Sequence, residues 1–203
     1  MKELSESLKI LEFCENYFMK YGFHKTTMDE IAKELRISKK TIYKHFSTKD
    51  ELIRAVFVRI RNDLGGRIET IINSDGDAII KLYKISDLFS KRVATISNKW
   101  LNDLQFYAPD IWQEVNDFRI KIMQKNMTLL VEQGKSEGLI NNFPTNIIMG
   151  VLISSVQGVV NPEFVLHNNI SIGKAGETVL EIVFSGILSK KGKKLLKQYN
   201  SGN

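Results

Sequence analysis

Three helix starts lie within one short stretch, residues 26–52, TTMDEIAKELRISKKTIYKHFSTKDEL. Thr27 and Glu30 have the spacing of a capping box, in which two side chains satisfy the free amides at a helix start. Ser38 is a good N-cap for the next helix, and Thr48 begins a second box that opens a third. Very little chain separates these helices, so the stretch predicts a helix-turn-helix.

The second of these helices, residues 38–46, has one apolar face and one cationic face. At about 100° per residue, Ile42 and Phe46 share a stripe and are predicted to be buried. The opposite face carries Lys40 and Lys44, flanked by hydroxyl, phenol and imidazole groups. Such side chains reach phosphate oxygens and base edges in a major groove. A merely solvated helix face is the alternative, because lysine is usually exposed. The capped neighbouring helix and the outward tyrosine favour DNA.

The same stretch resembles the DNA-binding signature of TetR-family transcriptional regulators, over about residues 8–57. The matching residues are Thr26-Thr27, Ile31-Ala32, Ser38, Thr41-Ile42-Tyr43, His45-Phe46 and Lys49-Asp50-Glu51-Leu52. The resemblance implies an all-α homodimer with an N-terminal helix-turn-helix that binds an operator. It also implies a larger helical domain that binds a small molecule and thereby releases the DNA.

The chain departs from this family at Arg36, where the turn usually contains glycine. A non-glycine residue there must adopt a left-handed backbone conformation or alter the turn. The tilt of the second helix therefore depends on how Arg36 is accommodated.

Helix geometry and the matching family positions together give a set of predicted DNA contacts. The residues expected to face the groove are Lys39, Lys40, Thr41 and Lys44. The residues expected to hold phosphates are Thr27, Tyr43, His45 and Lys49. Because a two-fold protein reads a two-fold site, the expected partner is double-stranded DNA with an inverted-repeat operator.

The formal net charge of +6 is concentrated at the two ends of the chain. Residues 1–61 contribute +4, residues 62–189 contribute −3 and residues 190–203 contribute +5. A basic N-terminal segment suits nucleic acid, and the mildly acidic middle argues against DNA lying along the whole protein. The lysine-rich run 190–194 is expected to be a solvated, partly disordered end.

Apolar residues at helical spacing continue beyond residue 52 and predict an all-α protein. The expected helices lie at about 5–21, 48–72, 78–94, 100–107, 110–138, 144–160 and 172–188, with a loop through 167–169. The predicted domains are a helix-turn-helix DNA-binding domain at 1–50 and a helical ligand-binding and dimerisation domain at 51–203. Their boundary falls inside the helix that begins at residue 48.

The two long helices at 146–160 and 172–188 are apolar on most of their surface. Such helices must be buried on most of their surface, and a domain of this size has too little protein to cover both. We therefore predict a homodimer in which they form a four-helix bundle with a second copy. Val156 and Val183 are placed on that surface, and small residues such as Gly150 allow close helix approach. Two internal core helices are the alternative.

Large side chains are frequent in the middle of the chain, which favours an apolar cavity between about residues 78 and 143. The predicted ligand-binding residues are Phe89, Trp100, Phe106, Trp112, Phe118 and Met123. Ligand pockets are mostly apolar, although ordinary core packing also explains most of these side chains. No cluster of charges suggests a phosphate or polyacid, so the expected effector is an apolar or amphipathic molecule.

Motifs for catalysis are not found in the sequence. It contains no phosphate-binding loop, no metal-ligand spacing and no nucleophile elbow, so no enzyme, metal or cofactor is expected. We find no apolar run long enough to span a bilayer and no signal peptide, so a cytoplasmic protein without a membrane partner is expected.

The predicted function is a sequence-specific transcriptional regulator, in the form of a repressor that an apolar or amphipathic small molecule releases from its operator. One alternative is a constitutive DNA-binding protein that senses no small molecule. Another is a helix-turn-helix fused to an interaction or enzymatic helical domain. A closed apolar cavity would favour the sensor, a cleft with convergent acids the enzyme, and a further exposed apolar patch the interaction module.

Overall fold

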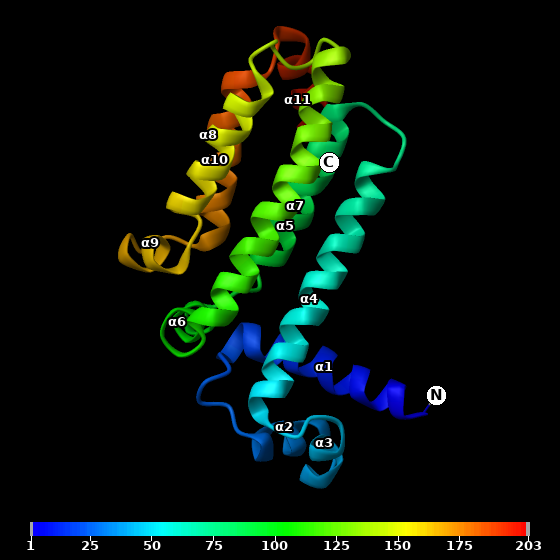
Figure 1. Ribbon diagram of the computed structural model, residues 1–203, viewed down its shortest axis with the longest axis vertical. Coiled ribbons are helices and arrows are strands. Elements are labelled where there is room, and N and C mark those ends of the chain that lie inside the picture. Colours follow the sequence, from blue (N-terminus) through cyan, green and yellow to red (C-terminus); the bar gives the residue numbers. More distant parts are fainter. Residues whose placement is uncertain (1, 202–203) are drawn as a thin grey trace. The chain divides into compact units, whose positions relative to one another are not determined.

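Helices account for all the regular structure over residues 2–201, the part of the chain that the computed structural model describes (Figure 1). The elements are α1 (Lys2–Tyr21), α2 (Met28–Leu35), α3 (Lys39–His45), α4 (Lys49–Ile72), α5 (Ala78–Val93), α6 (Asn98–Tyr107), α7 (Pro109–Ser136), α8 (Thr145–Val159), α9 (Pro162–His167), α10 (Ile172–Ile187) and α11 (Lys190–Ser201). One isolated antiparallel bridge joins Ile140 and Leu188. The predicted all-α fold is confirmed.

The helices pack into two compact units. The first contains the residues up to 64 together with 95–115, and thus α1 to α3, most of α4, α6 and the start of α7. The second contains Gly65–Ala94 and the residues from 116 onward. The domain limits at residue 50 stay a prediction, because a compact unit is not the same as a functional domain.

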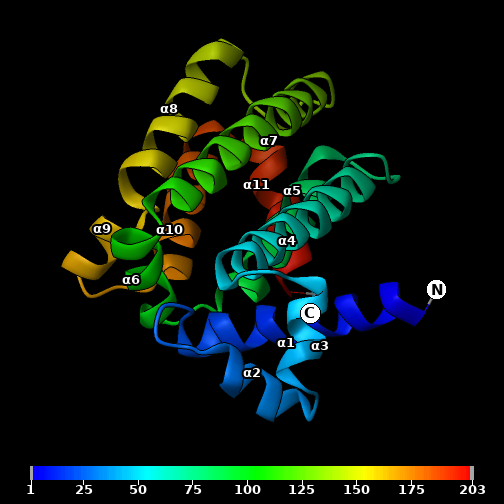
Figure 2. The same cartoon turned by 60° about the horizontal axis from the view of Figure 1, so that its bottom comes forward.

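An apolar core holds the first unit together, and Figure 2 shows its helices α1, α2 and α3 side by side. Phe18, Ile31 and Ile42 are completely buried in it. Trp100 of α6 adds an aromatic cluster, because its ring lies 5.5 Å from that of Phe23 and 4.8 Å from that of Phe57. These rings bring α6 into the same unit as the helix-turn-helix.

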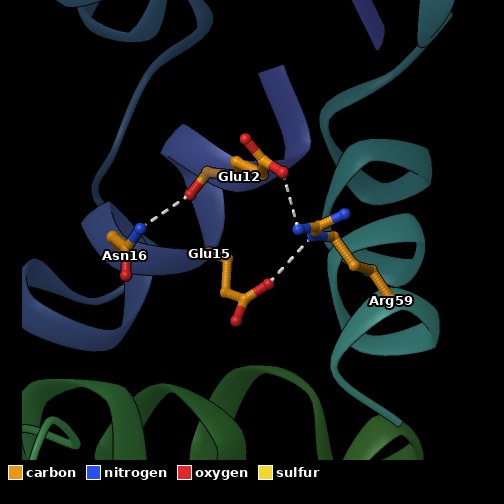
Figure 3. A network of polar contacts seen from close by, with 4 residues as sticks. All are labelled: Glu12, Glu15, Asn16 and Arg59. Carbon is orange, nitrogen blue, oxygen red and sulfur yellow. Dashed lines mark hydrogen bonds and ion pairs between the residues drawn. The ribbon is translucent and has the colours of Figure 1, made fainter. Parts of the chain in front are cut away.

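Arg59 of α4 joins α4 to α1 through two carboxylates (Figure 3). Its Nη2 donates to Oε1 of Glu12 at 2.9 Å, and its Nε donates to Oε2 of Glu15 at 3.2 Å. Glu15 is buried, whereas Glu12 is exposed. A buried carboxylate needs such hydrogen bonds, so Arg59 compensates the charge of Glu15 at the α1–α4 contact.

In the second unit, α10 packs against α8 and α5, and α11 packs against α5. The aliphatic side chains of Ile79, Leu130 and Leu152 are fully buried there. Arg119 of α7 is also largely buried, and its Nη1 donates to the carbonyl of Val160 at 2.8 Å, just beyond the end of α8. Burial lowers the pKa of this guanidinium to about 10.

The expected disordered end at 190–194 is wrong, because these residues begin α11. Tyr199 of α11 donates a hydrogen bond to Asp77 at 2.8 Å, and Asp77 in turn caps the start of α5. Gly192 is buried against the carbonyl of Leu139. The lysines are exposed on one side of a helix whose other side packs, so the charge run describes only half of its surface.

A short helix, α9, occupies part of the segment between α8 and α10 that was expected to be a loop. Asn161 accepts a hydrogen bond from the amide of Phe164 at 2.8 Å, and Pro162 takes the first helical position. Asn161 and Pro162 follow directly after the end of α8 and begin α9, as an N-cap asparagine and an N1 proline often do.

Candidate nucleic-acid interface

The predicted start of α2 is confirmed by a complete capping box. Thr27 Oγ1 accepts from the amide of Glu30 at 3.2 Å, and Glu30 Oε2 accepts from the amide of Thr27 at 2.8 Å. Ser38 Oγ accepts from the amide of Thr41 at 3.0 Å and so caps α3 as expected. Between the two helices Arg36 has φ 54° and ψ 40°, so the turn keeps its left-handed conformation without glycine.

The two faces of α3 divide as predicted. Ile42 lies on the buried side, and Phe46, directly after the helix, is buried as well. The exposed residues of α3 are Lys39, Lys40, Tyr43 and Lys44. The unit therefore presents three cations and a phenol on one short helix that is anchored from behind.

An ion pair links this exposed face to α2. Lys39 Nζ lies 2.9 Å from Asp29 Oδ2, and the hydrogen bond to Asp29 raises the pKa of Lys39. Lys39 Nζ also lies 6.0 Å from the ring centre of Tyr43, within the range of a cation–π contact. Asp29, which we did not single out in the sequence, thus sits beside the proposed contact surface.

His45 was predicted to hold a phosphate and is placed against α1 instead of facing outward. Its Nε2 lies 2.9 Å from Oε2 of Glu6, and only 10% of its side chain is exposed. The partner Glu6 lies 39 residues away in the sequence, and local helix geometry gave no signal for it. The phosphate contact of His45 stays a prediction.

Lys49, the first residue of α4, points its amine at the loop between α1 and α2. Its Nζ donates to the carbonyl of His24 at 2.6 Å, and burial lowers its pKa. The capping box expected at this helix start forms only in part. Thr48 accepts from the amide of Glu51 at 3.1 Å, but the Glu51 carboxylate accepts from the amide of Ser47 at 2.8 Å. The phosphate contact of Lys49 also stays a prediction.

The predicted ligand-binding residues are distributed over both units. Trp100 is 3% exposed inside the aromatic cluster of the first unit, whereas Phe106 is 65% exposed. Trp112 is half-buried in the same unit. The other predicted residues, Phe89, Phe118 and Met123, lie in the second unit and are half-buried. The predicted set therefore does not form one cluster within either unit.

A surface hollow in the second unit has a different lining from the one we predicted. It is formed by Asp117, Ile120, Lys121, Gln124, Lys125 and Gln157, on α7 and α8. Five of these six side chains are polar or charged, and none of them is a predicted ligand-binding residue. Our search for aromatic residues could not have found them.

The helix-turn-helix geometry agrees with a sequence comparison. Residues 10–56 match the profile of the family described as bacterial regulatory proteins, tetR family. The N-terminal part of the chain is thus a helix-turn-helix of the tetR family type. The match covers α1 from Ile10, the whole of α2 and α3, and the first part of α4.

Further relatives extend the likeness over most of the chain. The uncharacterised HTH-type regulator YvaF of Bacillus subtilis is 26% identical over 163 residues, which cover 79% of this chain and 85% of YvaF. A protein from Saccharomonospora viridis in complex with choline, described as a transcriptional regulator, has a TM-score of 0.68 at 18% identity, covering 91% of this chain and 98% of that one. The complex of SmeT with triclosan has a TM-score of 0.62 at 15% identity, covering 92% and 93%. At these identities the solved structures show the shared fold.

Within 2–201, no group of three or more histidine, cysteine or acidic side chains is arranged to hold a metal ion. No helix in that part of the chain is long and apolar enough to cross a membrane.

Proposed function

We propose that this TetR-family regulator represses transcription by binding an inverted-repeat operator through α3, and that an apolar or amphipathic small molecule releases it. The observation that carries the proposal is the exposed face of α3, on which Lys39, Lys40 and Lys44 project from a helix anchored by Ile42. Cations on a short, firmly seated helix can reach both phosphates and base edges. The TetR-family match over the same residues supports this assignment.

The proposed contacts divide between base edges and phosphates. Lys39, Lys40, Thr41 and Lys44 lie toward the groove, and Thr27, Tyr43, His45 and Lys49 approach the backbone. His45 and Lys49 are only partly exposed, so their share of the contact is expected to be smaller than that of the exposed lysines of α3.

Effector binding is proposed on the strength of two structural relatives. The Saccharomonospora viridis protein is complexed with choline and SmeT is complexed with triclosan. SmeT itself is described as the repressor of a multidrug efflux pump of Stenotrophomonas maltophilia. Both ligands are small organic molecules. Triclosan is apolar, in keeping with the proposed effector, whereas choline is a polar cation. A ligand that prefers a conformation with misplaced α3 helices must weaken DNA binding by the same factor by which DNA weakens ligand binding.

We further propose that the regulator is a homodimer joined through α8 and α10. Ile147 and Val151 of α8 are 59% and 53% exposed, and Ile182 of α10 is 68% exposed. Gly150 lies between Ile147 and Val151 on α8, and a Cβ at this glycine would meet no other atom. Exposed aliphatic side chains beside small residues suit close packing of a second copy.

The DNA proposal is tested with duplexes that the wild-type protein selects from a random-sequence pool. Lys40→Ala and Lys44→Ala should lose affinity and also tolerate substitutions in the selected site, because they remove base contacts. Lys49→Ala should weaken binding to all sequences alike and reduce the salt slope by about 1. Lys84→Ala, an exposed charge in the second unit, is the control and should bind normally. Normal binding by all three test variants in a mobility-shift titration would rule out α3 as the reading helix.

The release proposal is tested with choline and triclosan as first probes, followed by a panel of apolar compounds. A true effector should raise the melting temperature and weaken operator binding about 5- to 150-fold, the usual range of allosteric coupling. Compounds that stabilise the protein but leave operator affinity unchanged would instead support the constitutive DNA-binding alternative.

A further inference from the structure

The loop between α1 and α2, residues 22–27, is held by contacts from two other helices. Lys49 of α4 donates to the carbonyl of His24 at 2.6 Å. Within the loop, Thr26 Oγ1 donates to the carbonyl of Gly22 at 2.9 Å, and Thr26 is buried. The loop runs directly into Thr27, the N-cap of α2, so its position determines where the helix-turn-helix begins.

Asp103 of α6 makes the most concentrated contact with this loop. A single carboxylate oxygen, Oδ2, accepts from the amide of Phe23 at 2.5 Å and from the amide of His24 at 2.8 Å. Two backbone donors that converge on one ionised oxygen form charge-assisted hydrogen bonds, which are stronger than bonds between neutral groups. Asp103 thus caps a loop that lies 79 and 80 residues before it.

Gly22 makes this close approach sterically possible. Its φ of +81° lies in the left-handed region that favours glycine, and a Cβ at this position would overlap Oδ2 of Asp103. Two independent requirements, one of backbone conformation and one of space, therefore meet at the same residue.

Two further residues of α6 flank Asp103 and contact the same loop. The ring of Tyr107 stacks on that of His24 with centres 3.4 Å apart and planes 8° apart. The ring of Trp100 meets that of Phe23 edge-on at 5.5 Å. Positions 100, 103 and 107 fall on one side of a helix, so α6 presents an aromatic–carboxylate–aromatic stripe to the loop.

We propose that Asp103 is a positioning residue for DNA binding, because its carboxylate fixes the loop from which α2 and α3 extend. It touches no DNA in this scheme and acts through the backbone of Phe23 and His24. The proposal rests on the DNA contact proposed for α3. The sequence alone gave no reason to connect Asp103 with the helix-turn-helix.

The test compares Asp103→Ala with Asp103→Asn. Both variants remove the same charge, but asparagine keeps a carbonyl oxygen that can accept from both amides, so their difference reports the hydrogen bonds. Alanine favours helix more than aspartate does, so Asp103→Ala should not unwind α6. Asn102→Ala, exposed on the same helix, is the matched control.

Three quantities are measured for each variant: affinity for the selected operator, affinity for a random-sequence duplex, and hydrogen exchange at the amides of Phe23 and His24. For Asp103→Ala we expect operator affinity to fall about tenfold, the loss that corresponds to one charge-assisted hydrogen bond. Affinity for the random duplex should be unchanged, because no α3 cation is removed. Exchange at both amides should accelerate. The operator affinity of Asp103→Asn should stay within about twofold of the wild-type value. Asn102→Ala should bind the operator as tightly as the wild type.

A second pair of variants keeps the test decisive if Asp103→Ala folds poorly. Gly22→Ala should displace the carboxylate and reproduce the loss of operator affinity. Adding Asp103→Ala to it removes the overlap, so the double variant should lose less than the product of the two single losses. Faster amide exchange with unchanged operator affinity would overturn the positioning role. Wild-type protein that selects no DNA sequence would overturn the proposed function itself, and these two failures are distinguishable.

Discussion

Arg36 holds the turn between α2 and α3 in a left-handed conformation, with φ 54°. This conformation costs a residue with a Cβ about 1–2 kcal/mol, and glycine adopts it freely. We predict that Arg36→Gly raises the free energy of unfolding by about 1 kcal/mol, less than the full backbone cost because glycine also gains freedom in the unfolded chain. Urea titration followed by circular dichroism measures the change.

Asn169 provides the control for this prediction, since it is the other non-glycine residue with positive φ among the described residues, at 51°. Asparagine tolerates the left-handed region, so Asn169→Gly should change the unfolding free energy much less. If Arg36→Gly destabilises the protein, the arginine side chain must make stabilising contacts that outweigh the strain of its backbone.

At the scale of elements, the α1–α4 contact depends on Arg59 more than on its exposed partner (Figure 3). Arg59→Ala removes a guanidinium hydrogen bond from the buried carboxylate of Glu15, and we predict a loss of about 2 kcal/mol in unfolding free energy. Glu12→Ala removes only an exposed ion pair and should cost less than about 1 kcal/mol. Equal losses for the two variants in denaturant titration would show that burial of Glu15 does not set the energetics of this contact.

A pair of glycine variants tests the packing of α11. Gly192→Ala would press a Cβ into the carbonyl of Leu139, and such overpacking is expected to cost about 1–3 kcal/mol. Gly66→Ala, in open space on α4, should instead stabilise by about 0.5–1 kcal/mol, because alanine is the better helix former. Stabilisation by both variants, measured as melting temperature, would mean that α11 is not packed as described.

The sequence predicts an element well when its determinants lie within a few residues. The Thr27 box, the Ser38 cap and the buried Ile42 are local features, and all three were predicted correctly. The partner of the Phe23 and His24 amides could not be predicted, because Asp103 reaches them only through tertiary packing.

Composition was misleading where one side of a helix dominates it. In α11 the many lysines gave no sign of the half-buried Leu195, Leu196 and Tyr199. Tyr199 lies one helical turn after the two leucines, on the same side of the helix. The aromatic residues predicted to bind a ligand stay a prediction, because they are divided between the two units. Trp100 serves the core of the first unit and Phe106 is exposed, so aromatic density did not identify a cavity.

At the scale of the whole molecule, the predicted dimer surface needs different test residues from those chosen on sequence. Val156 and Val183 are only 5% and 7% exposed, so they belong to the core of the chain itself. Ile182→Glu should instead convert the dimer to a folded monomer, since an unpaired carboxylate would be buried only in the assembly. Val183→Glu should unfold the protein, and Lys84→Glu, an exposed control, should remain dimeric. Light scattering at micromolar concentration and thermal unfolding separate these outcomes, and a monomeric wild type would refute the dimer.

The division of α3 into an anchored side and an exposed side has an evolutionary consequence. Substitutions at Lys40 and Lys44 remove no core contact, so each is expected to change stability by no more than about 0.5 kcal/mol. Substitutions at Ile42 are expected to cost several times more. Given the proposed DNA contact of α3, descendants of this gene can acquire new target sequences by exchanging outward residues one at a time, while selection for folding preserves the inward ones.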